Sequence, residues 1–468
     1  MKIKSLRMPK IGFLPLYIKL YDESNPGMRE TVNKFVEQTK HKLENNGLCV
    51  VASDICRVRE EFEAAIRLFE QEDVDAIVTL HAAYSPSLES AELLCNTRLP
   101  IIVLDTTYNY EFTPYTYSAG MLYNHGIHGV MDMCNMLRRG GKKYSITAGF
   151  IGEENPDSQK VIDELVAYAY AYMIKKELSR TRVGLIGSQF EGMGDFRIDF
   201  DRMKDELGIE VVEYDDSEGM KRLQNVSCEE IEKEYKKDSE RFNITASRKT
   251  YDLSARVGLA VRKWVEEQSL DAFTMNFKAA LRNTGFPTMP FAEASIAMGE
   301  GKGYAGEGDV LTAAFVSALM KAFTDVTFTE CFCPDWKHGN IFLSHMGEYN
   351  VALSNPDAKP EMKEIDFIYC DADNPTAVLA PLREGRSVFV SLNPAPEGKF
   401  EIYTAAGQML YTPFDNKQNY VVSGWFKPDM PLEEFLCDYS KNGGIHHAAM
   451  VYGDDDTLLV LEKLKEIF

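Results

Sequence analysis

The sequence lacks any apolar run of the roughly 18 to 20 residues that a helix needs to cross a bilayer. Its N-terminal stretch, MKIKSLRMPK, is basic but has neither the apolar core nor the small-residue cleavage site of a secretory signal. Basic residues are scarce overall, with 51 Lys and Arg against 72 Asp and Glu and a formal net charge of -21. Such an acidic surface repels nucleic acid and anionic membranes. We therefore expect a cytoplasmic protein without nucleic-acid or membrane partners.

Cysteine does not occur in the pattern of a disulfide framework. The 9 Cys are scattered and odd in number, which favours reduced thiols. Cys331 and Cys333 lie near His338, but a zinc site of this type needs a second cysteine pair. Their C-x-C spacing fits alternate positions of a strand that lines a core or a pocket. Histidine is also rare, at 8 residues, so histidines inside motifs are informative.

The remaining composition is typical of a globular protein, with 45% hydrophobic and 26% charged residues, and 468 residues suggest two or three domains. Up to residue 150, apolar strand-like runs alternate with amphipathic helical runs. This alternation predicts βαβ units around a parallel sheet that carries ligands at the carboxyl ends of its strands. The predicted strands are 11–16, 48–52, 76–80 and 101–104, and the predicted helices are 28–45, 59–72, 88–95 and 120–137.

A second alternating region follows a helical run at 157–176, and beyond residue 324 the pattern changes to short segments broken by Pro, Asn, Asp and Gly. The change predicts an antiparallel sheet or small barrel. The predicted elements are strands 183–187, 211–214 and 272–277 with helix 255–268, then strands 387–392, 399–405 and 420–424 with a terminal helix 458–467. We therefore expect an α/β protein of two serial Rossmann-like lobes and a C-terminal antiparallel β domain, with limits at 1–176, 177–323 and 324–468.

The stretch from Gly299 to His345 carries the strongest chemical signal. A glycine-rich turn delivers Glu307 to the start of a helical segment, a strand-like run ends on Glu330, and a second apolar run carries His345. Two carboxylates and an imidazole at the ends of regular elements can converge on one divalent cation and leave coordination positions open. This pattern indicates a metal-dependent catalytic site.

A fourth candidate ligand lies in G-G-I-H-H, where His446 and His447 precede an apolar run. Adjacent side chains of an extended segment point to opposite faces, so one of the two would face a metal. We favour His447, and His446 is the alternative.

The glycine-rich run 299–308 could also be a nucleotide-binding loop. It lacks the preceding strand, the spacing and the downstream acid of a dinucleotide fingerprint, and it has no G-K-S/T of a P-loop. Backbone freedom that positions Glu307 is the better interpretation.

Further motifs occur in an informative order. They are G-Y-A-G-E-G-D before a T-A-A helix, then F-T-E, L-S-H-M-x-E and G-G-x-H-H, with F-T-M-N-F at 273–277, H-A-A-Y-S-P at 81–86, T-T-Y-N at 106–109 and N-H-G at 124–126 upstream. Together, over most of the chain, they resemble the L-arabinose isomerase family, within the wider arabinose and fucose isomerase superfamily.

The resemblance implies a metal-dependent aldose–ketose isomerase that acts through an enediol or enediolate. L-arabinose to L-ribulose is the single reaction it favours, with a related pentose or hexose as the alternative substrate. It implies that Glu307, Glu330, His345 and His447 hold a divalent metal, commonly Mn²⁺, with Mg²⁺ or Co²⁺ as alternatives. Glu307 and Glu330 would also move protons, and either could act at carbon.

The resemblance also implies a sugar pocket and an assembly. The implied substrate-binding residues are Leu14, Tyr17, His125, Phe277, Phe328 and His446. Phe277 and Phe328 could equally be strand core. The family's subunits form shared active sites, which implies a homo-oligomer, a hexamer or trimer, with His125 reaching a neighbouring subunit. Within its own lobe, His125 could instead cap a helix.

Two departures from the family lie where the sugar is chosen. Leu14 and Leu122 replace glutamines of the family's pattern. Lost polar contacts matter because sites that pair a hydroxyl discriminate strongly against its absence. We therefore expect isomerase chemistry with a substrate that carries an apolar or differently placed substituent.

Two other classes of protein share some of these features. A two-lobed sugar-binding protein, cytosolic or exported and without catalysis, would also have serial α/β lobes, but it would not need four metal-ligand positions. A metal-dependent aldolase would use a similar centre and would change the number of carbons in its substrate.

Overall fold

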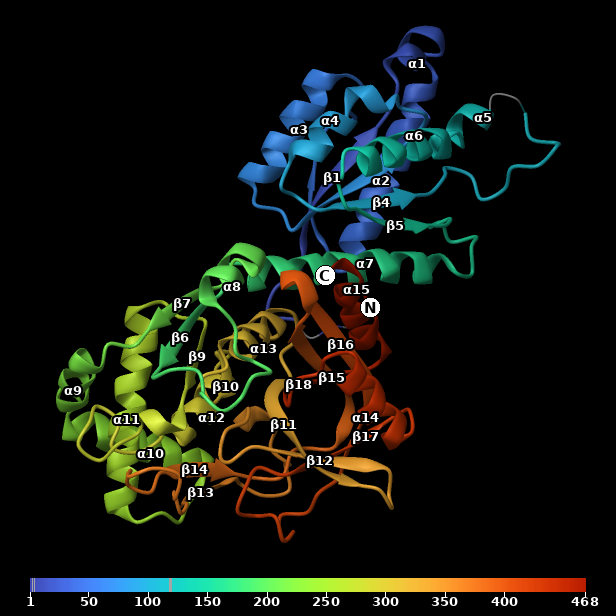
Figure 1. The fold of residues 1–468 in the computed structure, drawn as a ribbon. Helices are drawn as coiled ribbons and strands as arrows, with labels where there is room; N and C mark the ends of the chain where they lie inside the picture. The colour runs from blue at the N-terminus through green and yellow to red at the C-terminus, as the bar shows by residue number, and fades with distance from the viewer. Residues whose placement is uncertain (2, 4, 118–119) are drawn as a thin grey trace. The chain divides into compact units, whose positions relative to one another are not determined.

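The computed structural model describes residues 1, 3, 5–117 and 120–468 (Figure 1). Apart from residues near the termini, the chain divides into two compact units, Arg7–Lys176 and Glu177–Glu466. No helix within the described residues is long and apolar enough to cross a membrane. The domain limits 1–176, 177–323 and 324–468 stay a prediction.

The first unit is built on a parallel sheet of five strands, in the order β2-β1-β3-β4-β5. The strands are β1 (Lys10–Leu16), β2 (Cys49–Ala52), β3 (Ala76–His81), β4 (Ile101–Asp105) and β5 (Ser145–Ala148). The helices are α1 (Lys19–Ser24), α2 (Met28–Asn45), α3 (Arg59–Gln71), η1 (Ser87–Glu89), α4 (Ala91–Asn96), α5 (Gly120–Tyr123), α6 (Gly126–Arg139) and α7 (Ser158–Leu178), the last of which continues past Lys176. Strands and helices alternate as the sequence predicts.

One face of this sheet packs on α3, α4 and α6. Leu14 and Leu16 point to the same face because side chains alternate along a strand, and both belong to this core. Phe69 of α3 is 0% exposed and lies over Gly12 of β1, where a Cβ atom would be only 2.5 Å from the ring. The absence of a side chain at Gly12 therefore sets how closely α3 approaches the sheet.

The second unit contains a parallel sheet of four strands, in the order β10-β9-β6-β7. The strands are β6 (Arg182–Ile186), β7 (Glu210–Glu213), β9 (Ala272–Met275) and β10 (Gly303–Gly306). The accompanying helices are α8 (Phe200–Leu207), α9 (Asp216–Gln224), α10 (Cys228–Arg241), α11 (Arg248–Glu267), η2 (Phe277–Ala279), α12 (Phe291–Gly299) and α13 (Val310–Ala322). β10 leads directly into the turn that carries Glu307.

The same unit contains a closed antiparallel barrel, in the order β11-β12-β17-β16-β15-β18 (Figure 1). Its strands are β11 (Val326–Asp335), β12 (Asn340–Ser344), β15 (Gly385–Pro394), β16 (Phe400–Leu410), β17 (Gly424–Pro428) and β18 (His447–Tyr452), and η3 (Val351–Leu353), η4 (Pro396–Gly398), α14 (Leu432–Lys441) and α15 (Asp455–Ile467) complete this part. The predicted fold class, two parallel-sheet lobes followed by a small antiparallel barrel, is confirmed.

Other features differ from the sequence predictions. A small sheet of β8 (Asn243–Ile244), β13 (Glu361–Glu364) and β14 (Thr376–Leu379) was not predicted. The predicted helix 120–137 is broken at Asn124, whose side chain bonds the backbone of Gly120 and Asn109 at 3.0 Å each and so competes with helical hydrogen bonds. The predicted strand 420–424 is mostly loop: β17 begins only at Gly424, although the N–H of Val422 still bonds the carbonyl of His345 in register with the β12–β17 ladder.

Replacing Gly12 by alanine tests the packing of the first unit. Gly12→Ala forces the new methyl group against Phe69, and over-packing of this kind costs about 1 to 3 kcal/mol of unfolding free energy. Gly27→Ala is the matched control, because Gly27 precedes α2 with φ -64°, and no described atom beyond its chain neighbours lies within 4 Å of an added Cβ. Urea unfolding should show a lower midpoint for Gly12→Ala alone. Equal midpoints for the two variants would contradict this packing.

Candidate metal centre

The register of the barrel brings Glu330 and two histidines to one end of it. Glu330 on β11 is paired with His447, the first residue of β18. On its other side Glu330 is paired with Ser344, the last residue of β12, and His345 follows directly. The strand ladder therefore gathers side chains that lie more than a hundred residues apart in the sequence.

Glu307 reaches this end of the barrel from the carboxyl end of β10. Its φ of 62° is in the left-handed region, which non-glycine residues adopt at a cost of roughly 1 to 3 kcal/mol. The hydroxyl of Thr274 holds the turn by accepting from the N–H of Gly308 at 3.1 Å. Gly306 permits the close approach of His345, since a Cβ atom there would lie 2.7 Å from the imidazole. The glycines flanking Glu307 thus serve a turn and a close contact.

Three histidines of the site are each held through Nδ1 by a carboxylate. The pairs are His345 with Glu348 at 2.5 Å, His446 with Asp195 at 2.5 Å, and His447 with Asp309 at 2.9 Å. A carboxylate at Nδ1 fixes both the orientation of the ring and the nitrogen that remains available. Each imidazole therefore presents its Nε2 atom to the centre.

The inward-facing atoms cluster without satisfying one another. His446 Nε2 and His447 Nε2 lie 3.5 and 3.9 Å from Glu307 Oε2, and His345 Nε2 lies 3.9 Å from Glu330 Oε2. Glu307 Oε2 and the Nε2 atoms of His446 and His447 are buried and have no hydrogen-bond partner among the described residues. Two groups have ligand atoms all within 4.8 Å of one another, Glu307 with His446 and His447, and Glu330 with His345 and His447. His447 belongs to both.

The electrostatics of the site are dominated by its acids. Burial opposes the charged imidazole of His345, but Glu348 outweighs it and raises the pKa to about 9. Burial likewise opposes the charge on His446, and its hydrogen bond to Asp195 raises the pKa to about 10. Burial raises the pKa of Glu307, yet the neighbouring His446 brings the net pKa below its ordinary value. Carboxylates outnumber imidazoles here, so the centre attracts positive charge.

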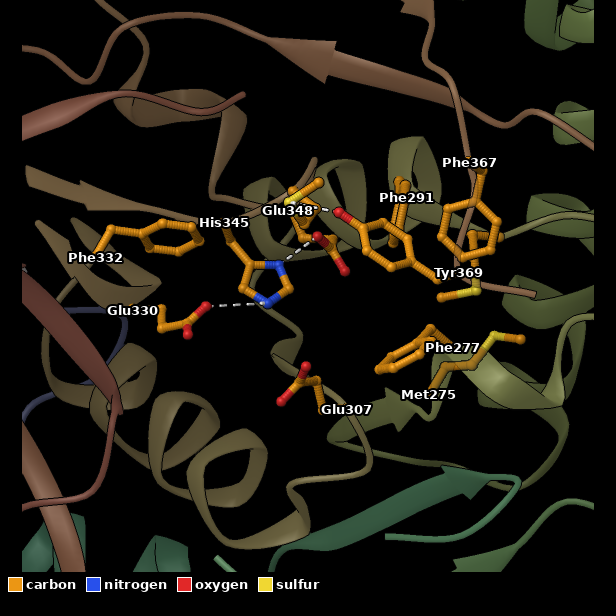
Figure 2. Close-up of a pocket in the computed structure, with 12 residues that line it drawn as sticks. Met275, Phe277, Phe291, Glu307, Glu330, Phe332, His345, Glu348, Phe367 and Tyr369 are labelled. Atoms are coloured by element: carbon orange, nitrogen blue, oxygen red, sulfur yellow. Dashed lines mark hydrogen bonds and ion pairs between the residues drawn. The ribbon is translucent and has the colours of Figure 1, made fainter. Parts of the chain in front are cut away.

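A cavity of about 210 Å³ opens beside these groups. Figure 2 shows Glu307, Glu330 and His345 facing one another along its edge. The aromatic ring of Phe277 lines the same cavity. The arrangement can bind a divalent cation and leave room for a small polar molecule beside it.

The structure places the other predicted site residues in different surroundings. Phe328 is 1% exposed, and its ring lies 4.9 Å from the rings of both His345 and His447. Its ring therefore packs against the imidazoles. The role predicted for Phe328 in binding substrate stays a prediction.

Leu14, Tyr17 and His125 belong to the first unit. Leu14 and Tyr17 are 0% exposed, and the Tyr17 hydroxyl has no hydrogen-bond partner among the described residues. His125 precedes α6 but makes no side-chain capping bond, and its Nε2 lies 3.0 Å from His128 Nδ1. It lines a cavity with Asn109 and other residues of the 107–125 segment. Their predicted sugar-binding roles stay predictions.

Sequence reasoning missed the carboxylates that hold the three imidazoles. Asp309 and Glu348 lie inside the motifs G-Y-A-G-E-G-D and L-S-H-M-x-E, so their spacing from Glu307 and His345 was a usable signal. Asp195 lies 251 positions from His446 in a loop without periodic pattern, and nothing local marks it.

The fold and the cluster define an α/β protein with a carboxylate–imidazole centre at one end of a closed barrel. A family model described as the L-arabinose isomerase central domain matches residues 199–325. L-arabinose isomerase 1 of Bacillus licheniformis is 24% identical over 410 residues, which cover 86% of this chain and 80% of the relative. The L-arabinose isomerases of Pediococcus pentosaceus and Levilactobacillus brevis are each 23% identical, and each match covers at least 90% of both chains.

These matches agree with the resemblance found in its motifs, and the chain is similar to L-arabinose isomerases along most of its length. A solved ABC transporter solute-binding protein from Burkholderia multivorans covers 67% of this chain and 93% of its own. Its 12% identity and TM-score of 0.16 carry no argument about fold or function.

Replacing Asp309 by asparagine tests whether its charge prepares His447 for a cation. Asp309 also caps α13 by accepting from the N–H of Thr312 at 2.9 Å, and asparagine preserves such a cap. Removing a carboxylate behind a ligating histidine weakens metal binding about 10- to 100-fold. Titration calorimetry with Mn²⁺ should show this loss for Asp309→Asn.

The matched control is Asp199→Asn, because Asp199 caps α8 in the same way and holds no imidazole. The control should bind Mn²⁺ as the unaltered chain does. Equal affinities for both variants would contradict a role for Asp309 in the centre.

Proposed function

We propose that this protein is a metal-dependent aldose–ketose isomerase that acts through an enediol. The observation that carries the proposal is the cluster of two glutamates and three Nε2 atoms that face one another across 3.5 to 4.0 Å beside a cavity. The relatives named L-arabinose isomerase support the same chemistry. L-arabinose or a related pentose or hexose is the proposed class of substrate.

The donor set fits a divalent cation. A buried polar atom without a partner normally costs free energy. Glu307 Oε2 and His447 Nε2 have no hydrogen-bond partner among the described residues, which supports a bound cation as their partner. Glu307, Glu330, His345 and His447 would hold the ion, and mixed carboxylate and imidazole ligands suit Mn²⁺, with Mg²⁺ or Co²⁺ as alternatives. When bound, the cation would polarise the carbonyl group of the sugar and stabilise negative charge on its oxygen.

The two glutamates divide the proton transfers of the reaction. Isomerisation moves one proton from C2 to C1 and one from the C2 hydroxyl to the carbonyl oxygen, so no outside oxidant or reductant is needed. Glu307 follows β10 and Glu330 lies on β11, and both line the cavity. One glutamate would act at carbon while the other acts at oxygen. The Nε2 atom of His446 also faces both glutamates, 3.5 Å from Glu307 Oε2 and 4.0 Å from Glu330 Oε1.

The protein acts as a homo-oligomer, a hexamer or trimer, in which His125 of one subunit completes the site of the next. Large aromatic side chains in the segment before His125 are highly exposed, with Tyr115 at 94% and Tyr117 at 89%. Tyr110 and Phe112, 54% and 56% exposed, line a cavity together with His125. Exposed apolar groups gathered in one place are typical of interaction surfaces. The cytoplasm remains the expected location.

Replacing either glutamate by glutamine tests the catalytic assignment. Glu307→Gln and Glu330→Gln should each lower kcat by at least about a hundredfold, the lower end of what general acid–base catalysis supplies. Ketose formation from a panel of aldoses with Mn²⁺ is the assay, and bound Mn²⁺ is measured in each variant to separate lost metal from lost proton transfer. The control is Glu300→Gln on the exposed end of α12.

Near-normal turnover in either variant that still binds Mn²⁺ would show that the catalytic groups are misplaced. Sugar binding by the unaltered protein without any ketose formation would favour the alternative, a sugar-binding protein without catalysis.

Complementation tests the shared site. His125→Ala and Glu307→Ala should each be inactive alone, because each removes a group from every site of its own oligomer. Co-expressed, they should regain partial activity, since some mixed interfaces then contain neither lesion. Tandem affinity tags isolate the mixed oligomers. No recovery in isolated mixed oligomers would contradict the contribution of His125 to a neighbouring site.

A further inference from the structure

The cavity beside the carboxylate–imidazole cluster has a polar side and an apolar side. Figure 2 shows Glu307, Glu330 and His345 on one side, and the rings of Phe277 and Tyr369 on the other. Met275 and Phe367 lie near these rings in Figure 2, and the Met346 sulfur lies 4.0 Å from the Tyr369 hydroxyl. Met289 and Phe291 also line the cavity. A molecule that reacts at the glutamates therefore extends toward aromatic rings and thioethers.

The apolar side offers few hydrogen bonds to a sugar. Glu348 also lines the cavity, but its Oε1 accepts from Tyr304 at 2.9 Å and its Oε2 from His345 at 2.5 Å and the N–H of Gly347 at 3.0 Å. Glu348 is 1% exposed, so its bonding capacity is used within the protein. The remaining strong side-chain donor on the apolar side is the Tyr369 hydroxyl, because thioether sulfurs accept only weakly.

The aromatic side is held in place by its neighbours. The ring of Tyr369 packs on Phe277 and Phe367 at centroid distances of 5.9 and 5.5 Å, and Phe367 packs on Phe291 at 5.9 Å. These rings come from η2, from α12 and from the segment between β13 and β14. Contacts of this kind bury apolar surface and fix ring orientations.

Hydrogen bonds anchor the segment that carries Phe367 and Tyr369. Cys370 Sγ lies 2.9 Å from the carbonyl of Ala280, and the hydroxyl of Thr288 donates to the carbonyl of Asp373 at 2.7 Å. The N–H of Asp373 donates to the carbonyl of Pro287 at 2.8 Å. The apolar side is thus tied to the segment that follows β9, close to the reacting groups.

Such a surface discriminates between the ends of otherwise identical sugars. A hydroxyl that loses water against aromatic rings and finds no partner is penalised, whereas a methyl group there gains from the loss of water. A hydroxymethyl end and a methyl end of the same sugar therefore differ most where the cavity is apolar. Two substrates that differ by one such group commonly differ about 10-fold or more in kcat/KM.

Resting on the isomerase activity proposed above, we propose that the substrate is an aldose whose end remote from the carbonyl is deoxygenated. A 6-deoxyhexose is the simplest such sugar. Its C1 and C2 lie at Glu307 and Glu330, and its terminal methyl group lies against Phe277, Phe367 and Tyr369. A plain pentose or an ordinary hexose is the competing outcome.

Matched sugars test the proposal. L-arabinose, D-fucose and D-galactose share their configuration at C2 to C4 and carry hydrogen, methyl or hydroxymethyl at C5, and L-fucose with L-galactose and L-rhamnose with L-mannose extend the comparison to other configurations. Ketose formation is measured with Mn²⁺-loaded protein. In the best configuration the methyl sugar should exceed the hydroxymethyl sugar by at least about tenfold in kcat/KM.

The outcomes separate the two proposals. Ketose formed fastest from L-arabinose or from a hydroxymethyl sugar overturns the deoxygenated substrate and leaves the isomerase intact. No ketose from any aldose of the panel overturns the isomerase and the substrate class with it.

A variant tests the apolar side directly. Met346→Gln keeps the length of the side chain and adds an amide that can pair with a hydroxyl, so it should lower the methyl-to-hydroxymethyl ratio of kcat/KM several-fold. Met220→Gln is the matched control, because Met220 is 38% exposed on α9 and does not line this cavity. Its ratio should equal that of the unaltered protein. An unchanged ratio in Met346→Gln, with Mn²⁺ binding retained, overturns selection by the apolar side.

Discussion

Three imidazoles, each held at Nδ1 by a carboxylate, are the constraint on which the rest of the site depends. A free imidazole can rotate and exchange tautomers, but Glu348, Asp195 and Asp309 leave only the Nε2 atoms facing the centre. The same acids add negative charge behind the rings. Oriented imidazoles and carboxylates of this kind are well suited to hold a cation, and a cavity opens beside them.

The parallel sheet and the barrel of the second unit supply this site in different ways. Strand β10 of the parallel sheet ends in a strained turn that carries Glu307. Ligand sites commonly lie at the carboxyl ends of such strands. The barrel contributes Glu330 and His447 through strand register, which a closed sheet fixes firmly. Gly306 of the glycine-rich turn packs against the His345 ring, and this contact brings Glu307 next to the side chains that the barrel supplies. The cavity beside them then receives its apolar side from the segment between β13 and β14.

The sequence predicts those features that are encoded locally. Alternating apolar strands and amphipathic helices predict both parallel sheets, and short broken segments predict the barrel. The small sheet was missed because Asn243 pairs with Glu361, far along the chain, through a strand too short to show a period. Glu307 and His345 stand in recognisable motifs, whereas Asp195 meets His446 only through the tertiary fold. The break at Asn124 escaped prediction because its side-chain amide donates to the carbonyl of Gly120, an acceptor that a continuous helix would use.

Anomalous diffraction from crystals containing Mn²⁺ would test the central claim most directly. We expect one strong peak per chain, in the second unit, within ligand distance of Glu307, Glu330 and the Nε2 atoms of His345 and His447. The Nδ1 atoms of both imidazoles should stay on Glu348 and Asp309. A peak elsewhere in the chain, or imidazoles turned away from their carboxylates to bind through Nδ1, would contradict it.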